Sequence, residues 1–252
     1  MTLPPAFLTR PLAHRALHDR AQGRPENSRA AIRAAIEHGY GIECDLQLSA
    51  DGVPMVFHDE HLMRLTGQDG AVRERTAEEL GRLGLKGGQE GVPTLAEVLA
   101  LVAGSVPLLI EVKDQSHSLG PVEGLLEEAA VASLRGYEGP VALMSFNPHS
   151  VTVLRDAAPD LPRGLTTCDF DPEEPEWAPA GVTRLSHLRA IADFEAAGAC
   201  FISHDRTDLH RPRVAELKAM GIPVLCWTIR SAEQEREARR IADNVTFEGY
   251  LA

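Results

Sequence analysis

Eight short apolar segments recur along the chain, and stretches with helical character separate them. This alternation is typical of a parallel sheet, because each crossover to the next parallel strand needs a connection of helix length. A chain of 252 residues with eight such units has the size of one closed barrel. The sequence therefore predicts an α/β fold, a TIM (β/α)8 barrel, as a single domain over residues 1–252. The expected strands are 12–15, 41–45, 108–113, 141–146, 164–168, 200–204, 223–228 and 244–248.

Helix start signals lie between these segments. Thr76, Thr94 and Ser231 are each followed three residues later by Glu or Gln, which is the spacing of a capping box. Asn27 is expected to cap the helix after the first strand, and Gly39 to mark its end. These signals predict structure and carry no function.

Composition restricts the class of partner. The formal net charge of -12 argues against nucleic acid or an anionic membrane, since both bind clustered Lys and Arg. No apolar run approaches the roughly 20 residues that span a bilayer, and the N-terminal segment has no continuous apolar signal region. The four cysteines have no CxxC spacing, so we expect small buried side chains in a reducing compartment. The protein is expected to be soluble and cytoplasmic.

One stretch, GIECDLQLSADGVPMVFHD at 41–59, carries the strongest chemical signal. Glu43 and Asp45 alternate onto one face of the expected strand, where two carboxylates repel each other unless a cation or a shared proton offsets the repulsion. A turn at Asp51-Gly52 follows, and its register places Asp45 opposite Phe57. The hairpin is therefore predicted to bring His58 back beside the acidic pair.

The first three expected strands all end in polar residues. His14 and Arg15 end the first, Glu43 and Asp45 the second, and the third, after an apolar run, ends in Glu111 and Lys113. Barrels of this type hold their chemistry at the carboxyl ends of the strands, so these side chains are expected to meet. Glu43, Asp45 and Glu111 offer oxygen donors with no cysteine, which favours one divalent cation, Mg²⁺ first and Ca²⁺ second, over Zn²⁺.

The remaining polar groups suit phosphoester chemistry. His14 and His58 would act as general acid and general base, while Arg15 and Lys113 would bind a phosphoryl group. The set indicates metal-assisted cleavage of a phosphoester. Each signal also has a plainer interpretation: Glu-x-Asp can be two solvated side chains, and Lys113 with Glu111 can be a structural ion pair.

Two further features concern the surroundings of this set. Phe146 and Trp227 end later strands and are expected to line the site, with a core position as the alternative for Trp227. Residues 59–93 exceed the other connections in length, which predicts a small lid-like insertion between the second and third barrel strands. Residues 169–181 are acidic and rich in proline, which is typical of a solvated loop.

Taken in order, these motifs resemble the glycerophosphodiester phosphodiesterase family, in its short cytoplasmic bacterial form. The resemblance covers nearly the whole chain. It departs from the family at Ala16, where glycine is usual, and at Phe247-Glu248-Gly249-Tyr250, where the usual ending is Thr-Asp-x-Pro. The matching motifs are His14-Arg15, Pro25-Glu26-Asn27-Ser28, Glu43-Cys44-Asp45, Asp51-Gly52, His58-Asp59, Arg64-Leu65-Thr66-Gly67, Pro93-Thr94-Leu95, Glu111-Val112-Lys113, Ser145-Phe146 and Trp227-Thr228.

The resemblance implies a TIM barrel that hydrolyses glycerophosphodiesters to glycerol 3-phosphate and an alcohol. It also implies metal-ligand roles for Glu43, Asp45 and Glu111 and acid/base roles for His14 and His58. Small water-soluble diesters such as glycerophosphocholine or glycerophosphoethanolamine are the expected substrates. Two alternatives stay open: a phospholipase D-like hydrolase of lysolipids on a related barrel, and a catalytically silent metal-binding regulatory barrel. The sequence does not distinguish a monomer from a homodimer.

Overall fold

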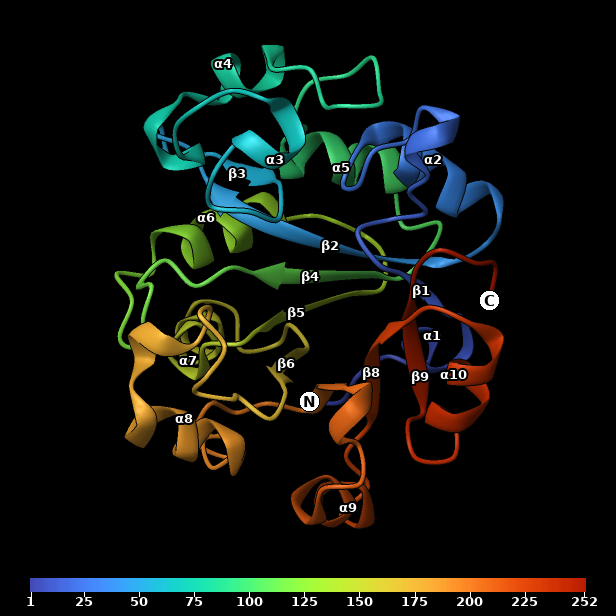
Figure 1. Cartoon of the computed structure of the whole chain (residues 1–252), viewed down its shortest axis with the longest axis vertical. Helices are drawn as coiled ribbons and strands as arrows, with labels where there is room; N and C mark the ends of the chain where they lie inside the picture. The colour runs from blue at the N-terminus through green and yellow to red at the C-terminus, as the bar shows by residue number, and fades with distance from the viewer.

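Eight parallel strands close into a barrel in the computed structural model, which describes all 252 residues (Figure 1). The first strand, β1, pairs with β2 on one side and with β9 on the other, and these two pairings close the ring. The barrel strands in order are β1 (Leu12–Ala13), β2 (Gly41–Leu48), β4 (Leu108–Val112), β5 (Val141–Ser145), β6 (Arg163–Thr167), β7 (Phe201–Asp205), β8 (Val224–Ile229) and β9 (Asn244–Phe247). The predicted TIM barrel is confirmed.

The strands lie within a few residues of their predicted bounds. The largest difference is in β2, which continues to Leu48 because it also pairs in antiparallel fashion with β3 (Pro54–Val56). The hairpin has the predicted register, since the backbone N–H of Phe57 donates to the carbonyl of Asp45 at 2.9 Å. A period-two pattern and a short turn were sufficient to fix it.

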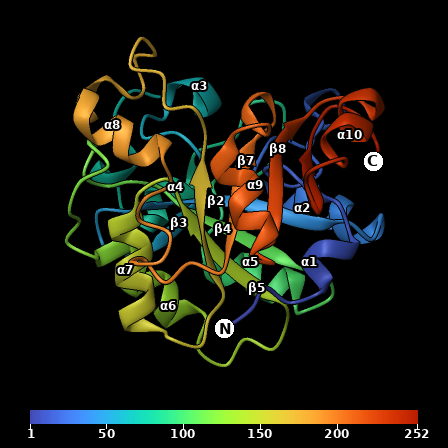
Figure 2. The same cartoon turned by 90° about the horizontal axis from the view of Figure 1, so that it is seen from below.

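Helices surround the strands, as both views show (Figures 1 and 2). The α-helices are α1 (Ala6–Thr9), α2 (Arg29–Glu37), α3 (Met63–Thr66), α4 (Ala77–Arg82), α5 (Leu95–Val102), α6 (Leu125–Ser133), α7 (Pro148–Ala157), α8 (Val182–Arg189), α9 (Pro212–Ala219) and α10 (Ala232–Ala238). The three predicted capping residues Thr76, Thr94 and Ser231 each accept a hydrogen bond from the backbone N–H three residues later.

The cap of α2 differs from the prediction. Ser28, and not Asn27, is the N-cap, because its hydroxyl accepts a hydrogen bond from the N–H of Ala31 at 3.1 Å. Asn27 lies one residue earlier in the left-handed region, with φ of 57°. Its side-chain amide instead donates to Asp45 at 2.9 Å, so the residue supports the acidic pair.

Two apolar clusters stabilise the barrel. The larger contains 41 buried residues and packs the outer face of the sheet against the helices, while a second cluster of nine packs Phe7 of α1 and Leu12 with strand residues such as Phe201. Asn244 fixes α1 in place, since its side-chain amide donates to the carbonyls of Phe7 and Arg10, both at 2.6 Å. The N-terminal segment therefore closes one end of the barrel and leaves the other end for a site.

The long connection after β3 has a small core of its own. Leu62, Leu65 and Leu80 pack with Met55 and Phe57 in a cluster of eight buried residues. The segment 59–93 therefore packs on the β2–β3 hairpin beside the barrel (Figure 1). That it acts as a lid stays a prediction.

Two expectations from composition concern the whole chain. All four cysteines are buried and unpaired, as expected. No helix of the fold combines the length and the apolar character that crossing a bilayer requires.

The packing inside the barrel generates a first prediction. A methyl group added at Gly164 of β6 would lie 2.5 Å from the ring of Phe201, which is fully buried. Gly164→Ala is therefore expected to lower the stability by about 1–3 kcal/mol, since overpacking forces neighbouring side chains from their rotamers. Gly84→Ala is the matched control, because nothing lies within 4 Å of the added methyl group. Thermal unfolding of both variants measures the difference, and equal melting temperatures would contradict this account of the packing.

Candidate active site

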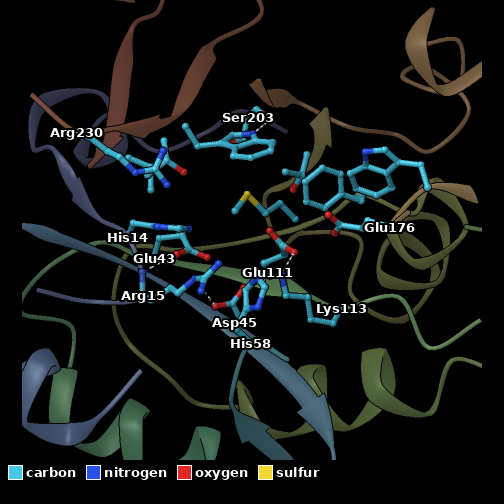
Figure 3. Close-up of a pocket in the computed structure, with 17 residues that line it drawn as sticks. His14, Arg15, Glu43, Asp45, His58, Glu111, Lys113, Glu176, Ser203 and Arg230 are labelled. Carbon is cyan, nitrogen blue, oxygen red and sulfur yellow. Dashed lines mark hydrogen bonds and ion pairs between the residues drawn. The ribbon is translucent and has the colours of Figure 1, made fainter. Parts of the chain in front are cut away.

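A cavity of about 220 Å³ opens at the carboxyl ends of the strands (Figure 3). Its lining includes all nine residues that the sequence predicted for a site. They are His14, Arg15, Glu43, Asp45, His58, Glu111, Lys113, Phe146 and Trp227. The barrel register brings them together from six different segments, so their convergence comes from the tertiary structure and not from their spacing in the chain.

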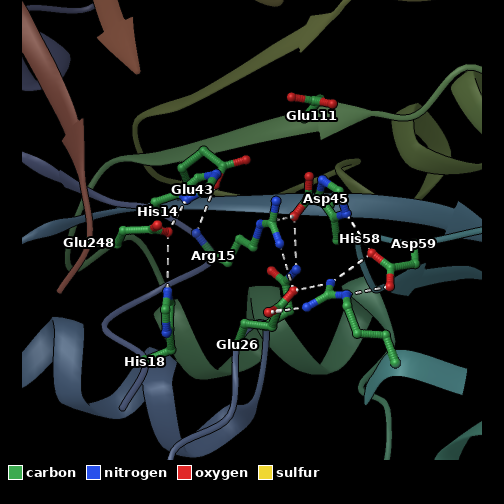
Figure 4. A network of polar contacts seen from close by, with 12 residues as sticks. His14, Arg15, His18, Glu26, Glu43, Asp45, His58, Asp59, Glu111 and Glu248 are labelled. Atoms are coloured by element: carbon green, nitrogen blue, oxygen red, sulfur yellow. Dashed lines mark hydrogen bonds and ion pairs between the residues drawn. The ribbon is translucent and has the colours of Figure 1, made fainter. Parts of the chain in front are cut away.

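Three carboxylates form the floor of this cavity. Glu43 and Asp45 project from β2, and Glu111 lies beside Asp45 because those two residues are register partners on neighbouring parallel strands. One oxygen from each of the three lies within 4.8 Å of the others, and all three side chains are buried. Figure 4 shows His14 and His58 on either side of this acidic cluster.

The neighbouring basic side chains shift the pKa values of the carboxylates to different extents. Burial raises the pKa of Asp45, but Lys113, His58 and Arg15 outweigh it and hold that pKa well below its usual range. The ammonium of Lys113 lies 2.9 Å from Asp45 and 2.5 Å from Glu111. The carboxylate of Glu43 accepts a single hydrogen bond, from the backbone N–H of Arg15 at 2.8 Å, and burial together with its acidic neighbours raises its pKa well above the usual range.

These carboxylates fit a divalent cation. If all three carboxylates were ionised, they would carry three negative charges against the two positive charges of Lys113 and Arg15, and Glu43 has no ion pair of its own. The donors are all hard oxygens, which suits Mg²⁺ or Ca²⁺ and not Zn²⁺. A further cation would stabilise the charged form of Glu43, which burial disfavours.

Carboxylates also hold both histidines. His14 follows β1, and its Nδ1 lies 2.6 Å from Oε2 of Glu248, which follows the neighbouring strand β9. Arg230 binds the other oxygen of Glu248 at 2.8 Å. The hydrogen bond from His14 lowers the pKa of Glu248, so this carboxylate stays ionised. Because Nδ1 is engaged, Nε2 is the nitrogen of His14 that is free for chemistry.

His58 has a comparable partner in the next residue. Its Nδ1 lies 2.7 Å from Asp59, and Arg64 of α3 binds both oxygens of Asp59. Arg64 also binds Glu26, which in turn accepts from Arg15 at 2.8 Å. These contacts link the 59–93 segment to the arginine beside the acidic cluster (Figure 4).

The backbone after β1 shows why glycine is usual at the position of Ala16. Arg15 and Ala16 have φ of 51° and 64°, in the left-handed region that favours glycine. This turn points the N–H of Arg15 at the side chain of Glu43 and the N–H of Ala16 at its carbonyl, at 2.8 and 2.9 Å. The strained turn therefore orients Glu43. A glycine at position 16 would adopt the same turn with less backbone strain.

Two aromatic side chains also line the cavity. The indole N–H of Trp227 donates to the carbonyl of Ser203 at 2.9 Å, and its ring meets Phe146 edge-on at 5.4 Å between centroids. Both rings line the cavity, so Trp227 lies at the site and not only in the core.

Sequence reasoning missed several residues that line or adjoin the cavity. The 169–181 segment was expected to be a solvated loop, but Glu176 and Trp177 line the cavity, and Trp177 is buried against Phe146. His18, which no motif singled out, lies 3.5 Å from Glu248. Position was the available signal for Glu248, since it ends the last strand at the same rim as His14. The loop carried no comparable signal.

The fold and the site together define a barrel enzyme with the groups for phosphoester hydrolysis. Comparison with known proteins narrows this class. A family model described as the glycerophosphoryl diester phosphodiesterase family matches residues 14–245. The chain belongs to this family of phosphoric diester hydrolases, as its motifs predicted.

Individual relatives agree with this placement. The chain is 37% identical over 150 residues to a glycerophosphodiester phosphodiesterase of Caldanaerobacter subterraneus subsp. tengcongensis, an alignment that spans 56% of this chain and 60% of that protein. The solved structure of an Oleispira antarctica phosphodiesterase in complex with the product sn-glycerol-3-phosphate is 25% identical, with a TM-score of 0.72. The match covers 96% of this chain and 94% of that chain. The solved structure of a glycerophosphodiester phosphodiesterase from Thermotoga maritima is 26% identical, with a TM-score of 0.67. This match covers 94% of this chain and 92% of that chain.

The charge imbalance at Glu43 generates a prediction about stability. A carboxyl whose pKa is raised on folding binds a proton that the unfolded chain has released, so stability falls as the pH rises above about 4.5 toward the raised pKa. At pH 8 the metal-free Glu43→Gln variant should therefore have a free energy of unfolding roughly 1–3 kcal/mol above that of the metal-free wild type, and this difference should shrink toward pH 4.5. Thermal unfolding across this pH range provides the measurement.

The same variant tests the cation site. Mg²⁺ should raise the melting temperature of the wild type, since it binds the folded form, and raise that of Glu43→Gln much less. Glu233→Gln, at an exposed position on α10, should respond as the wild type does. An equal gain in all three proteins would mean that the cation binds elsewhere.

Proposed function

We propose that this protein is a divalent-cation-dependent glycerophosphodiester phosphodiesterase. It would hydrolyse small water-soluble diesters, such as glycerophosphocholine or glycerophosphoethanolamine, to glycerol 3-phosphate and an alcohol. The observation that carries the proposal is the buried acidic cluster between two histidines, each held by a carboxylate. Family membership supports the reaction, and the product described in the Oleispira antarctica structure supports its outcome.

Glu43, Asp45 and Glu111 would hold the cation, Mg²⁺ in first place and Ca²⁺ in second. When bound, the cation would neutralise charge on the phosphoryl oxygens and favour attack at phosphorus. Arg15 and Lys113 would contact the phosphoryl group as well. Their ion pairs with Asp45 already hold both side chains beside the acidic cluster. These two basic side chains would stabilise the negative charge that develops on the phosphoryl oxygens during the attack at phosphorus.

His14 and His58 would move the protons. One would accept the proton of the attacking hydroxyl, and the other would protonate the departing alkoxide. Glu248 and Asp59 hold Nδ1 of the two rings, so Nε2 would exchange the proton in each case. Phe146 and Trp227 would contact the substrate, since both line the cavity.

Two alternative functions have less support. A hydrolase of lysolipids would need an exposed apolar lip around the cavity. None of the large exposed apolar side chains lines it: Met1, Met63, Leu125, Val182, Met220 and Leu251. A catalytically silent barrel would be expected to have lost a carboxylate or a histidine, and all five are present.

We further propose a cytoplasmic location. Four cysteines that are buried without forming disulfides support a reducing compartment. Small water-soluble diesters would reach the enzyme there without a lipid surface.

Glycerol 3-phosphate release from a panel of glycerophosphodiesters and lysolipids tests the proposed function. Activity should appear with small diesters, disappear in excess chelator, and return with Mg²⁺ or Ca²⁺, because the three acidic ligands need the cation. Glu111→Gln should need a higher Mg²⁺ concentration for half-maximal activity and melt as a folded protein. Full activity in excess chelator would refute the metal dependence, and release from lysolipids alone would favour the alternative substrate class.

The two carboxylate–histidine pairs give a prediction about turnover. Either histidine changed to alanine should lower kcat by about 10²-fold or more, since acid/base catalysis contributes on that scale. Glu248→Gln should lower kcat by about tenfold or more with little change in KM, because it acts through the orientation of His14.

A double-mutant cycle separates this role from a structural one. Glu248→Gln should cost little in the His14→Ala background, because the ring that it positions is already absent. Glu233→Gln is the control and should match the wild type. Additive losses from Glu248→Gln and His14→Ala would contradict the positioning role.

A further inference from the structure

We infer that the His58 side of this site is a subsite for a cationic leaving alcohol, formed by Glu176, Trp177 and Phe146. The inference rests on the proposed function, because it concerns the alcohol that the phosphodiester would release. It adds a preference that neither the acidic cluster nor the histidines impose. Head groups with an ammonium would be favoured over neutral ones of the same shape.

The first support is the shape of the site. A second cavity of about 280 Å³ adjoins the first, and six residues line both. The shared residues are His58, Glu111, Lys113, Phe146, Glu176 and Trp177. His14 and Arg230 line only the first cavity, so the extension continues from the His58 side of the acidic cluster. A phosphodiester held at that cluster would direct one of its two alcohols into this extension.

The second support is the distribution of charge. Arg230 and Glu176 lie at opposite ends of the first cavity (Figure 3). Glu176 makes no ion pair or hydrogen bond within the chain, whereas the ammonium of Lys113 is already bound to Asp45 and Glu111. The free charge at the His58 end is therefore negative, which favours a positive head group.

Glu60 and Asp114, two other acidic groups of the extension, already have partners within the chain. Glu60 faces Arg73 and His117, both at 3.3 Å. Asp114 accepts hydrogen bonds from Ser116 and Asn147 at 2.8 Å. None of these pairs leaves a positive charge that would repel an ammonium, so Glu176 remains the group available to a ligand.

The third support is an aromatic wall that is fixed in place. The rings of Phe146 and Trp177 lie 5.2 Å apart and both line the extension. Phe170 packs against Trp177 at 5.2 Å, in a cluster that also contains Leu185 and Leu188 of α8. Aromatic rings attract a cation near their faces, so a rigid pair beside a free carboxylate suits a choline-type or ethanolamine-type group.

Two substrates that differ only in charge test this subsite. The choline ester of glycerol phosphate and its 3,3-dimethylbutyl ester have the same shape, with carbon in place of the quaternary nitrogen. The wild type should show a kcat/KM at least about fivefold higher for the choline ester. Glu176→Gln should reduce this ratio by about threefold or more, while Glu173→Gln in the same loop, which lines neither cavity, should keep it.

The outcomes separate the subsite from the proposed function. Equal kcat/KM values for the two esters in the wild type would overturn the subsite and leave the phosphodiesterase intact. An equal fall of the ratio in both loop variants would overturn the role of Glu176. If neither ester is hydrolysed, the proposed function is wrong, and calorimetry then decides the subsite, because equal dissociation constants for the two esters would refute it.

Discussion

Mutual repulsion among three buried carboxylates is the constraint on which the open end of the barrel depends. Glu43, Asp45 and Glu111 lie within 4.8 Å of each other, so each neighbouring element has to supply compensation. Lys113 and Arg15 provide positive charge, and the strained turn after β1 brings a backbone N–H to Glu43. This compensation stays incomplete, which is the physical basis for expecting a cation there.

A chain of alternating charges extends from this cluster into the 59–93 segment. Arg15 binds Glu26, Glu26 binds Arg64, and Arg64 binds Asp59, which holds the ring of His58. The 59–93 segment therefore contributes to the site, since Arg64 of its helix α3 supplies one of these links. On the other side Arg230 and Glu248 do the same for His14. Both rings are oriented by groups that need not contact a substrate.

The sequence predicted some parts of the site better than others. The acidic pair, its hairpin and His58 followed from a period-two pattern and a turn, because local geometry fixes which residues of a hairpin face each other. The cap of α2 was assigned one residue too early, since Ser28 and Asn27 are both good capping residues and only the contact with Asp45 distinguishes them. The 169–181 loop was predicted least well, because Glu176 and Trp177 follow no repeating pattern.

The sequence by itself predicted the barrel, the order of its strands, and nine of the residues that line the cavity, since periodicity and position along each strand are local properties. Only the tertiary structure decided which partners those residues have. Glu248 meets His14 because closure of the barrel places the last strand beside the first. Trp177 meets Phe146 because packing against α8 folds an irregular loop over the cavity. Contacts between distant segments depend on closure and packing, which no local pattern in the chain records.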